Sequence, residues 1–382
     1  MTLPSSANVV IIGGGVIGVS VAYRLAEAGV RDVVLLERGS LGSGSTSRAA
    51  GGIRAQFSDP VNVRISTRSM AEYRQFATRF DQEIDLRTVG YLFLLTRQED
   101  VAAFERGVAV QNEYGVPSRM VDAKEARRLS PLVETADVLA AAYSPDDGYC
   151  TPESVVLGYA RAARRRGARL ITGCAVTGIQ RAGREVRAVE TDLGPIATST
   201  VICAAGAWSA AVGDMVGVPL PVLPYRRQLA FTSPIDTDIP VPMTIDFSSA
   251  LYFRREGRGL LIGLSDPEEQ PGFVTRPSET WAAKVADALA VRAPGLLDAG
   301  LTGGWAGLYE VTPDHNALVG EAAEVDRFLY ATGFSGHGFM QAPAIGEIVT
   351  DLVLRREPFI DVASLHAGRF SDERRNVELN YV

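Results

Sequence analysis

Residues 8–37 constrain the fold of this chain more than any other stretch. An apolar, β-branched run leads into the glycine pattern Gly13-x-Gly15-x-x-Gly18, an alanine-rich helical segment follows, and a second apolar run ends at Glu37. Strand, glycine turn, helix and strand in this order are typical of a βαβ unit, and the glycine spacing is typical of one that binds a dinucleotide. The sequence therefore predicts a Rossmann-like domain at the start of the chain.

Each glycine of the pattern has its own physical reason. Gly13 permits a tight turn out of the strand, Gly15 lets the backbone approach a pyrophosphate, and Gly18 lets the helix lie close to the sheet. The phosphates would lie at the positive end of a helix that begins near Val16. Glu37 has the spacing of a carboxylate that accepts hydrogen bonds from an adenosine ribose, and its charge would repel a 2′-phosphate. The stretch therefore favours FAD or NAD over NADP.

Composition limits the other possibilities. At 382 residues the chain is long enough for two domains, and 46% hydrophobic with 22% charged residues is typical of a globular protein. The net charge of −7 argues against nucleic acid or anionic lipid as a partner. Cys150, Cys174 and Cys203 have neither metal-ligand nor disulfide spacing, so we expect buried thiols and no metal site. Because the sequence shows no leader-like start and no apolar run of about 20 residues, we expect a cytoplasmic protein that does not enter the membrane.

Periodicity and capping signals predict the other elements. Thr151 can cap a helix that has Pro152 at its first position, and Asp122 with Glu125 resembles a capping box. We expect helices over 60–80, 98–114, 123–130, 152–166, 278–293 and 344–355, and strands over 89–96, 168–171, 175–180, 186–190, 199–203, 227–231, 250–254, 259–264 and 328–332.

Two later segments also bring small residues to the end of an apolar strand. Ala204-Ala205-Gly206 predicts either a second close approach of backbone to the dinucleotide or an ordinary tight turn. The glycine-dense loop 333–338 precedes a helix whose N-terminus would stabilise negative charge on a flat, electron-accepting ring.

The loop that follows Glu37 carries small residues and two arginines. Gly51 and Gly52 allow the backbone to press against a flat ligand, while Arg48 and Arg54 either meet a substrate carboxylate or are ordinary solvated arginines. The residues themselves leave both interpretations open.

Taken together, these motifs resemble a known family. The fingerprint, the loop 45–54, Ala204-Ala-Gly206-Ala-Trp208, Thr312-Pro-Asp314 and the segment 331–338 occur in this order along nearly the whole chain. The set is similar to the FAD-dependent D-amino acid oxidase superfamily, and most to its sarcosine oxidase, glycine oxidase and dimethylglycine dehydrogenase branch. The resemblance implies FAD rather than NAD. It also implies oxidation of a carbon–nitrogen bond, in which a neutral amine loses hydride to the flavin and the imine is hydrolysed.

The resemblance also implies the fold class and the domain division. We expect an α/β protein, α+β overall, in which a Rossmann-like FAD-binding domain carries a discontinuous substrate domain with a mixed sheet. The FAD-binding domain would comprise 1–87, 146–219 and 304–382, and the substrate-binding domain 88–145 and 220–303.

Four positions depart from the pattern of the family. The flavin-attaching cysteine of monomeric sarcosine oxidases matches Gly307, and the flavin-attaching histidine of dimethylglycine dehydrogenases matches Arg48, so we predict non-covalent FAD. Met340 stands where sarcosine oxidases have a lysine that binds the substrate carboxylate. Their oxygen-activating lysine falls near Leu261, which supplies no charge. Fast reaction with oxygen and simple sarcosine as the substrate are therefore open to test.

The remaining polar and apolar residues receive candidate roles. Arg54 is the first candidate for the substrate carboxylate, with Arg48 helping or lying against the flavin. Tyr252 matches an active-site tyrosine of relatives, although a half-buried strand tyrosine is the simpler interpretation. His337 would hydrogen-bond or supply positive charge, unless it is a surface residue, and Met340 would add an apolar wall that suits a hydrophobic substituent. The predicted FAD-binding residues are Gly13, Gly15, Val16, Ile17, Gly18, Glu37, Arg38, Ser45, Thr46, Arg48, Ala49, Gly51, Gly52, Val176, Ala204, Ala205, Gly206, Trp208, Gly333, Ser335, Gly336, His337, Gly338, Phe339 and Met340.

Three functional hypotheses remain at this point. The first is a flavin amine or amino acid oxidase that uses O2 and releases H2O2. The second is the flavin subunit of a hetero-oligomeric dehydrogenase that passes electrons to a partner. The third is an NAD-dependent dehydrogenase without flavin. An oligomer is compatible with each of them, and a small amine or amino acid is the expected substrate of the first two.

Overall fold

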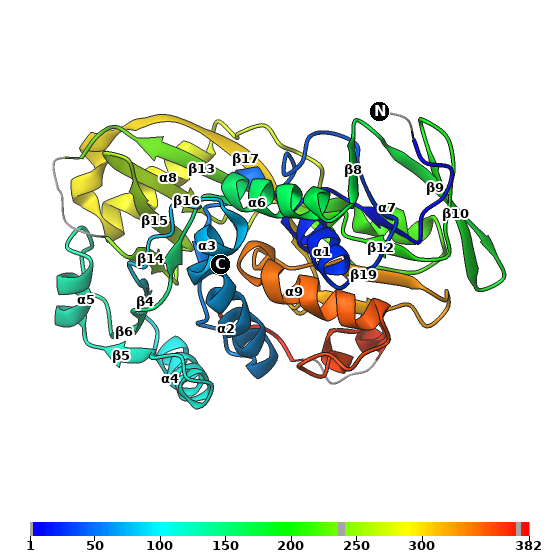
Figure 1. Ribbon diagram of the computed structural model, residues 1–382. Coiled ribbons are helices and arrows are strands. Elements are labelled where there is room, and N and C mark those ends of the chain that lie inside the picture. The colour runs from blue at the N-terminus through cyan, green and yellow to red at the C-terminus, as the bar shows by residue number, and fades with distance from the viewer. Residues whose placement is uncertain (1–2, 236–240, 372–375, 382) are drawn as a thin grey trace.

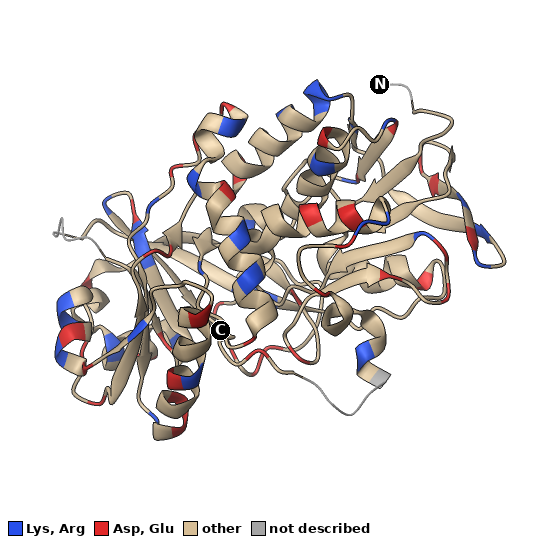
Figure 2. Cartoon of the chain, turned by 60° about the horizontal axis from the view of Figure 1, so that its bottom comes forward, with Lys and Arg blue, Asp and Glu red and all other residues tan. Residues whose placement is uncertain are grey.

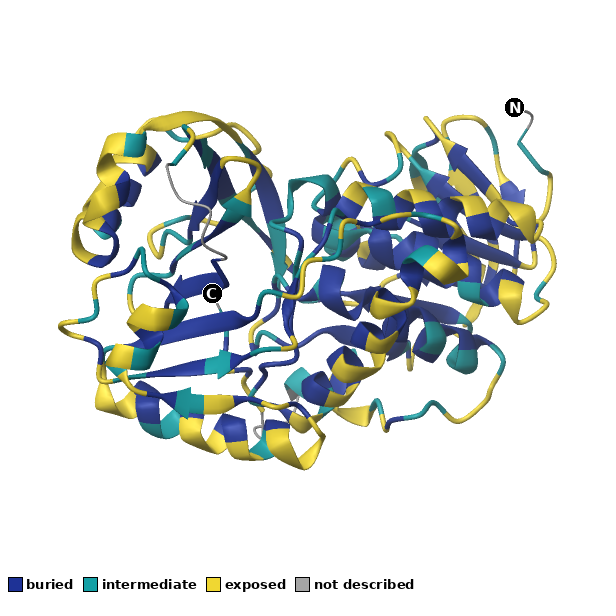
Figure 3. Ribbon diagram, turned by 60° about the vertical axis from the view of Figure 1, so that its left-hand side comes forward, coloured by how far each residue is buried: buried dark blue, intermediate teal, exposed yellow. Residues whose placement is uncertain are grey.

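The computed structural model describes residues 3–235, 241–371 and 376–381. Two sheets lie at opposite ends of the molecule, and the helices α2, α3 and α6 lie between them in the view of Figure 1. The central strands of the two large sheets and the inward helix faces are buried, whereas the outer helix faces, β9 and the start of β17 are mostly exposed (Figure 3). Lysine, arginine and the acidic residues are interspersed over the outer surface rather than gathered by sign (Figure 2). No helix among these residues is long and apolar enough to cross a membrane.

The first sheet has six strands in the order β18-β19-β12-β1-β2-β8. All pair in parallel except β18, which runs antiparallel to β19. Helix α1 packs against both α6 and α9 beside this sheet (Figure 1). The bounds are β1 Val9–Ile12, β2 Val33–Glu37, β8 Arg169–Thr172, β12 Val201–Cys203, β18 Leu318–Glu321, β19 Phe328–Thr332, α1 Val16–Glu27, α6 Pro152–Arg165 and α9 Gly338–Val353. The βαβ prediction for residues 8–37 is confirmed.

The second sheet has eight strands in the order β17-β13-β16-β15-β14-β4-β6-β5. Strands from two distant blocks of the chain meet in it, because β4 pairs in parallel with β14. Strand β17 pairs along β13, so this sheet continues past residue 304, where the sequence prediction began the last part of the FAD-binding domain. The bounds are β4 Tyr91–Leu95, β5 Arg119–Val121, β6 Ala140–Ser144, β13 Leu223–Thr232, β14 Met243–Asp246, β15 Leu251–Glu256, β16 Gly259–Leu264, β17 Leu301–Val311, α4 Gln98–Glu113, α5 Ala123–Leu129 and α8 Trp281–Arg292.

Smaller elements complete the fold. One three-stranded sheet lies beside the six-stranded sheet. A two-stranded sheet joins the loop after β2 to the segment before α6. The bounds are β9 Val176–Ala182, β10 Glu185–Thr191, β11 Ile196–Ala197, β3 Gly52–Ile53, β7 Gly148–Tyr149 and α7 Ser209–Asp214. The three cysteines are buried free thiols, as predicted.

Two predicted helix features are wrong in detail. The predicted helix 60–80 is two helices, α2 Pro60–Arg74 and α3 Phe76–Phe80, because Gln75 leaves the helical conformation between them. Thr151 stands at the N-cap position of α6, but its side chain makes no capping hydrogen bond. By contrast, Asp122 caps α5 by accepting from the backbone N–H of Glu125, as the capping pattern predicts.

The helix expected from residue 344 begins six residues earlier, at Gly338. Pro343 lies inside α9 and cannot donate a hydrogen bond to the carbonyl of Phe339. The Tyr73 hydroxyl of α2 donates to that carbonyl at 2.5 Å instead, which compensates for the missing bond. The N-terminus of α9 therefore lies in the glycine-dense loop itself, with His337 as its N-cap residue.

Candidate functional site

A cleft of about 560 Å³ runs along the carboxyl ends of β1, β2 and β12. The fingerprint turn lines it together with Glu37, the loop 43–49 and the segment 204–208, and its other wall comes from β17 and the start of α9. Ligands of open α/β sheets bind at this edge of the strands.

The glycines of the fingerprint are required by close backbone approaches. Gly13 has φ +111°, and a Cβ there would lie 2.3 Å from the carbonyl oxygen of Ala204. A Cβ on Gly18 would lie 1.9 Å from the carbonyl oxygen of Gly13, so the nearest obstacle is the turn, and the sheet residue Leu35 comes second at 3.4 Å. Gly15 is the N-cap residue of α1 and lines the cleft.

Two side chains order the same turn. The Glu37 carboxylate accepts from the backbone N–H groups of Gly14 and Gly39, both at 2.7 Å. The Thr46 hydroxyl accepts from the N–H of Val16 at 3.1 Å, at the N-terminus of α1. A carboxylate, a hydroxyl and a bare helix N-terminus around a narrow cleft form a donor and acceptor set that fits the ribose and pyrophosphate of a dinucleotide.

An aromatic cluster lies at one end of the cleft. The guanidinium of Arg38 lies 4.0 Å from the ring centroid of Trp208. Phe273, on the loop before α8, stacks on the same ring at 5.5 Å with an interplanar angle of 20°. Thr275 of that loop also lines the cleft, so the second domain contributes to its wall.

Glu310 places a carboxyl group in the wall of the cleft opposite Gly206. It accepts from the Thr332 hydroxyl at 2.9 Å and from the N–H of Gly333 at 3.1 Å. Burial raises the pKa of this carboxyl to about 7, although these hydrogen bonds oppose the shift.

A smaller cavity of about 100 Å³ opens from the cleft toward the eight-stranded sheet. Arg48, Ala49, Arg227, Tyr309, Gly336 and Phe339 line both spaces, which therefore adjoin each other. The floor is aromatic and aliphatic, with Tyr91, Phe93, Leu229, Met243, Ile245, Tyr252 and Met340. The adjoining spaces suit a dinucleotide whose ring end meets a small substrate.

Arg54 lines this cavity with a buried guanidinium. Its Nη2 donates to the carbonyl of Asn380 at 2.6 Å, and its Nη1 donates to the carbonyl of Gln56. The guanidinium lies over the Phe57 ring at 4.1 Å. Within the described chain it has no ion pair, and burial lowers its pKa.

His337 lies 3.4 Å from Nη2 of Arg54 through its Nε2 and meets the Phe57 ring edge-on. Burial, with the charge of Arg54 beside it, lowers the pKa of His337 well below its ordinary value. The imidazole is therefore neutral near pH 7, and the predicted option of a positive charge is wrong.

Arg227 is a site residue that the sequence did not single out. It lies on β13 opposite Gly307 of β17 and lines both the cleft and the cavity. Nη1 donates to the carbonyl of Arg226 and Nη2 to the Tyr381 hydroxyl, both at 3.0 Å, while Nε is buried without a partner. The described residues supply no carboxylate to it. In the sequence, Arg227 follows Arg226 on a predicted strand, and nothing in the local pattern shows which of the two arginines lacks a carboxylate partner.

Tyrosines surround the guanidinium of Arg227. It lies 5.1 Å from the ring centroid of Tyr309, whose hydroxyl is hydrogen-bonded to that of Tyr252. Burial raises the pKa of both phenols, so both are neutral donors or acceptors.

Gly52 accommodates a third tyrosine, because a Cβ there would lie 1.8 Å from the Tyr91 hydroxyl. Gly52 also lines the cavity, so this contact is a second reason for a glycine beside the predicted approach to a flat ligand.

Arg48 extends across Gly307. A Cβ on Gly307 would lie 2.7 Å from Cβ of Arg48, so the two positions at which relatives were expected to attach flavin are neighbours in space. The Arg48 guanidinium donates to the carbonyls of Ser43 at 2.6 Å and Gly44 at 3.2 Å.

The predicted site residues lie together with two exceptions. Gly18 lies behind the fingerprint turn, and Gly333, at φ +69°, packs against Thr312, so neither lines the cleft or the cavity. The cleft is lined by Gly13, Gly15, Val16, Ile17, Glu37, Arg38, Ser45, Thr46, Val176, Ala204, Ala205, Gly206, Trp208 and Gly338, and the cavity by Gly51, Gly52, Arg54, Tyr252, Ser335, His337 and Met340. The described residues contain no cluster of three His, Cys, Asp or Glu side chains placed to hold a metal.

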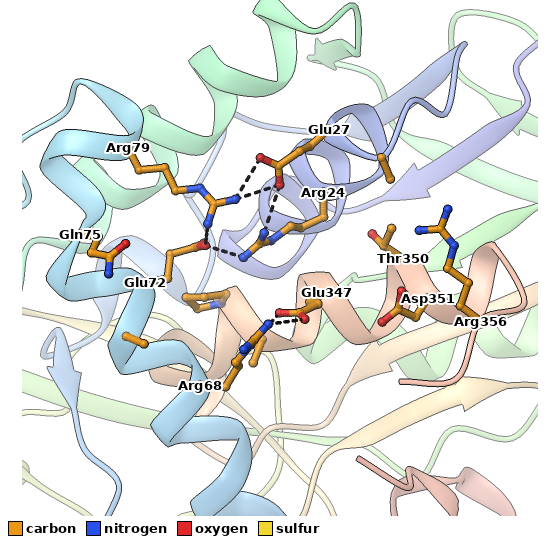
Figure 4. Close-up of a pocket in the computed structure, with 14 residues that line it drawn as sticks. Arg24, Glu27, Arg68, Glu72, Gln75, Arg79, Glu347, Thr350, Asp351 and Arg356 are labelled. Carbon is orange, nitrogen blue, oxygen red and sulfur yellow. Dashed lines mark hydrogen bonds and ion pairs between the residues drawn. The ribbon is translucent and has the colours of Figure 1, made fainter. Parts of the chain in front are cut away.

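A separate groove lies between α1, α2 and α9, with Arg24, Arg68, Arg79 and four acidic side chains around it (Figure 4). Glu72 accepts from both Arg24 and Arg79, and from the Tyr159 hydroxyl at 2.5 Å. Arg79 also pairs with Glu27 at 2.9 Å. These three arginines pair with carboxylates, and the groove has no contact with the cleft.

Comparison with known proteins gives consistent matches. The family model described as DAO, FAD dependent oxidoreductase, matches residues 8–352. Mitochondrial sarcosine dehydrogenase of Mus musculus is 33% identical over 96% of this chain and 42% of its own length, and mitochondrial dimethylglycine dehydrogenase of the same organism is 31% identical over 95% and 44%. The chain thus spans less than half the length of these curated relatives.

Two solved structures have the same fold over their whole length. L-proline dehydrogenase from P. horikoshii has a TM-score of 0.92 and 34% identity, covering 98% of this chain and 100% of that one. Glycine oxidase from Geobacillus kaustophilus has a TM-score of 0.84 and 28% identity, covering 96% and 99%.

Proposed function

Because the chain belongs to the DAO family of FAD-dependent oxidoreductases, we propose that it oxidises the carbon–nitrogen bond of an amino acid or secondary amine. An N-substituted α-amino acid is the preferred substrate class. Sarcosine, dimethylglycine and proline, which appear in the names of three similar proteins, all carry extra carbon on the α-nitrogen. The observation that carries the proposal is a cavity with unpaired arginines that opens directly onto the dinucleotide cleft.

The cleft residues support FAD as the cofactor. Glu37 would accept the ribose hydroxyls, and the N-terminus of α1 beside Thr46 would hold the pyrophosphate. The N-terminus of α9, at the junction of cleft and cavity, would face the ring. FAD, when bound there, supplies the acceptor for the hydride equivalent that leaves the C–N bond.

The cavity residues would bind and orient the substrate. Arg227 and Arg54 are the two candidates for its carboxylate, and Arg227 has the stronger support because its buried Nε–H has no acceptor. Met340 and Tyr252 would enclose the N-substituent and exclude water. His337, whose pKa is lowered by burial and by Arg54, is a poor proton acceptor, and a substrate that enters as the free amine needs no strong base.

We propose that FAD is held without a covalent bond. Gly307 and Arg48 offer no nucleophile at the positions where relatives were expected to attach it. Acid precipitation of the yellow protein should therefore release flavin into the supernatant. Colour that stays with the pellet would contradict this, and a colourless protein that reduces NAD with substrate would favour the NAD hypothesis.

The electron acceptor is proposed to be a redox partner, with O2 as the alternative. The chain has two lysines, Lys124 and Lys284, and Lys284 is paired with Asp266 away from the cavity. Leu261, at the position of the expected oxygen-activating lysine, is buried in β16. Peroxide production from the isolated protein with substrate in air measures the alternative directly.

Anaerobic bleaching of the flavin tests the proposed reaction. The panel should contain N-methyl and N,N-dimethyl glycine, L- and D-proline, glycine, and the primary L- and D-amino acids. We expect bleaching by at least one amino acid with a substituted nitrogen, and slower bleaching by the primary amino acids. A flavin that none of them reduces, while dithionite does, would overturn the proposal.

A further inference from the structure

Residues 376–381 do not line the cavity, but they contact two arginines that do, Arg54 and Arg227. The segment begins beside the turn that contains the Thr-Pro-Asp motif, where the Asn316 amide donates to the carbonyl of Asn376 at 2.7 Å. The N–H of Glu378 donates to the carbonyl of Asp314 at 3.0 Å. It ends beside β13 of the eight-stranded sheet, where Tyr381 contacts Arg227.

Glu378 anchors this segment. Its carboxylate is 1% exposed and accepts from the N–H and hydroxyl of Ser58, at 2.9 and 2.8 Å, from the N–H of Asp59 and from the Asn62 amide. A buried carboxylate is stable only with such a set of donors. The segment is therefore a built part of the fold at the N-terminus of α2.

The next two residues hold the two cavity arginines. The carbonyl of Asn380 accepts from Nη2 of Arg54, on the side of the FAD-binding domain. The Tyr381 hydroxyl accepts from Nη2 of Arg227, on the second sheet, and its ring stacks on His315 at 3.8 Å and 8°. Two adjacent residues thus set the positions of guanidinium groups that come from different domains.

The contact with Tyr381 leaves Arg227 ready for an anion. Nη1 and Nη2 are directed to neutral oxygens, so Nε and the remaining N–H groups are available, and no described carboxylate compensates the charge. A neutral acceptor orients a guanidinium without cancelling its charge, whereas a carboxylate in the same place would compete with the substrate.

We propose that the segment 376–381 is part of the substrate site, and that Tyr381 is a positioning residue which holds Arg227 against the carboxylate of the substrate. This inference rests on the proposed function. It makes carboxylate recognition depend on a hydroxyl that lies outside both sheets and does not line the cavity itself.

Tyr381→Phe in the FAD-loaded protein tests it, because the ring remains on His315 and only the hydroxyl is lost. Acetate, a carboxylate without an oxidisable amine, is titrated while the flavin absorbance is followed. We expect its dissociation constant to rise about fivefold to tenfold, as for the net loss of one ordinary hydrogen bond, because Arg227 keeps its charge and loses only its orientation. With a substrate, KM should rise by a similar factor while kcat and FAD content stay unchanged. Tyr114→Phe, which removes a hydroxyl from an exposed residue at the end of α4, should change neither quantity.

A double-mutant cycle separates positioning from a general loosening of the structure. If Tyr381 acts through Arg227, Tyr381→Phe should have no further effect on acetate affinity in an Arg227→Met background. Additive effects, or equal acetate affinity of Tyr381→Phe and the native protein, would overturn the proposal, as would a native protein to which acetate does not bind. Because acetate binding needs no turnover, failure of every amine to bleach the flavin would count against the proposed reaction and leave this result standing.

Discussion

The groove between α1, α2 and α9 and the central cavity are both rich in arginine. Three arginines of the groove pair with carboxylates, whereas those of the cavity have no described carboxylate partner. In the groove, Arg24 and Arg79 share the carboxylate of Glu72, and Arg68 pairs with Glu347 at 2.8 Å (Figure 4). In the cavity, the described partners of Arg54 and Arg227 are backbone carbonyls, the imidazole of His337 and a phenol.

Glu27 of the groove and Glu310 of the cleft wall differ in the same way. Burial opposes ionisation of Glu27 in the groove, but hydrogen bonds from Tyr23 and Arg79 outweigh it and lower the pKa of Glu27. Burial raises the pKa of Glu310 in the cleft wall to about 7, since no arginine compensates it. Around Glu72 the charges of the groove are paired within the protein, whereas Arg54 and Arg227 of the cavity have no described carboxylate partner and their charges are left for a ligand to balance.

Replacement of Arg227, a cavity arginine without a described carboxylate partner, should have the largest effect on substrate binding. Arg227→Met should raise KM about a hundredfold, because the substrate carboxylate would lose a charged, bidentate partner in a desolvated site. Bound FAD should stay at one per chain. The matched control is Arg226→Met: Arg226 is the neighbouring residue of β13, faces the other side and pairs with Glu269 at 2.8 Å. An unchanged KM for Arg227→Met, measured by stopped-flow flavin reduction, would remove Arg227 from the site.

Loss of the shared carboxylate of the groove should lower stability instead. Glu72→Gln should reduce the free energy of unfolding by about 2 kcal/mol, since Arg24 and Arg79 lose their common partner, and the partial exposure of Arg79 limits the loss. KM should not change. Urea unfolding of the FAD-loaded protein measures the first effect, and a variant as stable as the native protein would show that the groove is not balanced in this way.

Arg54→Met should have a smaller effect on KM than Arg227→Met. Arg54 already donates to two carbonyls, so we expect KM to rise about tenfold while bound FAD is retained. If Arg54 holds the substrate carboxylate itself, the order of the two variants will be reversed, and side-by-side Michaelis constants decide between them.

The pH dependence of FAD affinity should report on Glu310. Below pH 7 this carboxyl is protonated and neutral, whereas above pH 7 its negative charge would face an anionic dinucleotide, so affinity should fall a few-fold between pH 6 and 8. Glu310→Gln should flatten this dependence. Quenching of FAD fluorescence during titration of the apoprotein measures both, and identical slopes in the two proteins would contradict the assignment.

The exposed ion pair of the groove should have the smallest effect. The Arg68 side chain is 56% exposed, so Arg68→Ala should change the free energy of unfolding by less than about 0.5 kcal/mol and leave KM unchanged. A thermal melt that shifts as far as that of Glu72→Gln would show that exposure does not separate these pairs.

The fingerprint was predictable from sequence because its glycine spacing is local. Gly18 is needed by the carbonyl of Gly13 within the same turn, and although the backbone that Gly13 approaches belongs to the distant Ala204, the glycine spacing of the motif marks both positions. The start of α9 at Gly338 could not be predicted in this way. A proline such as Pro343 normally argues against a helix that begins before it. The hydroxyl that replaces the missing hydrogen bond belongs to Tyr73, which lies 266 residues before the acceptor Phe339.

The same distinction explains the site residues. Arg226 and Arg227 are identical neighbours in sequence, and only the position of Glu269 in space shows which of them is paired. The prediction identified Arg54 from its place in a glycine loop and missed Arg227, Tyr309 and Glu310, which lie on strands whose pattern resembles any half-buried strand. The protonation state of His337 could be assigned only from its burial, which the sequence does not show.

The interleaving of the two sheets has a consequence for how the chain is made. The six-stranded sheet cannot be completed until β19 has been synthesised. The eight-stranded sheet cannot be completed until β17 has been synthesised, some 200 residues after β4. Contacts so distant along the chain slow folding and leave the apolar strands of the N-terminal unit uncovered during translation. Chaperone demand in the cell should therefore depend on how soon residues 301–332 follow, although residues 8–37 contain the most recognisable motif.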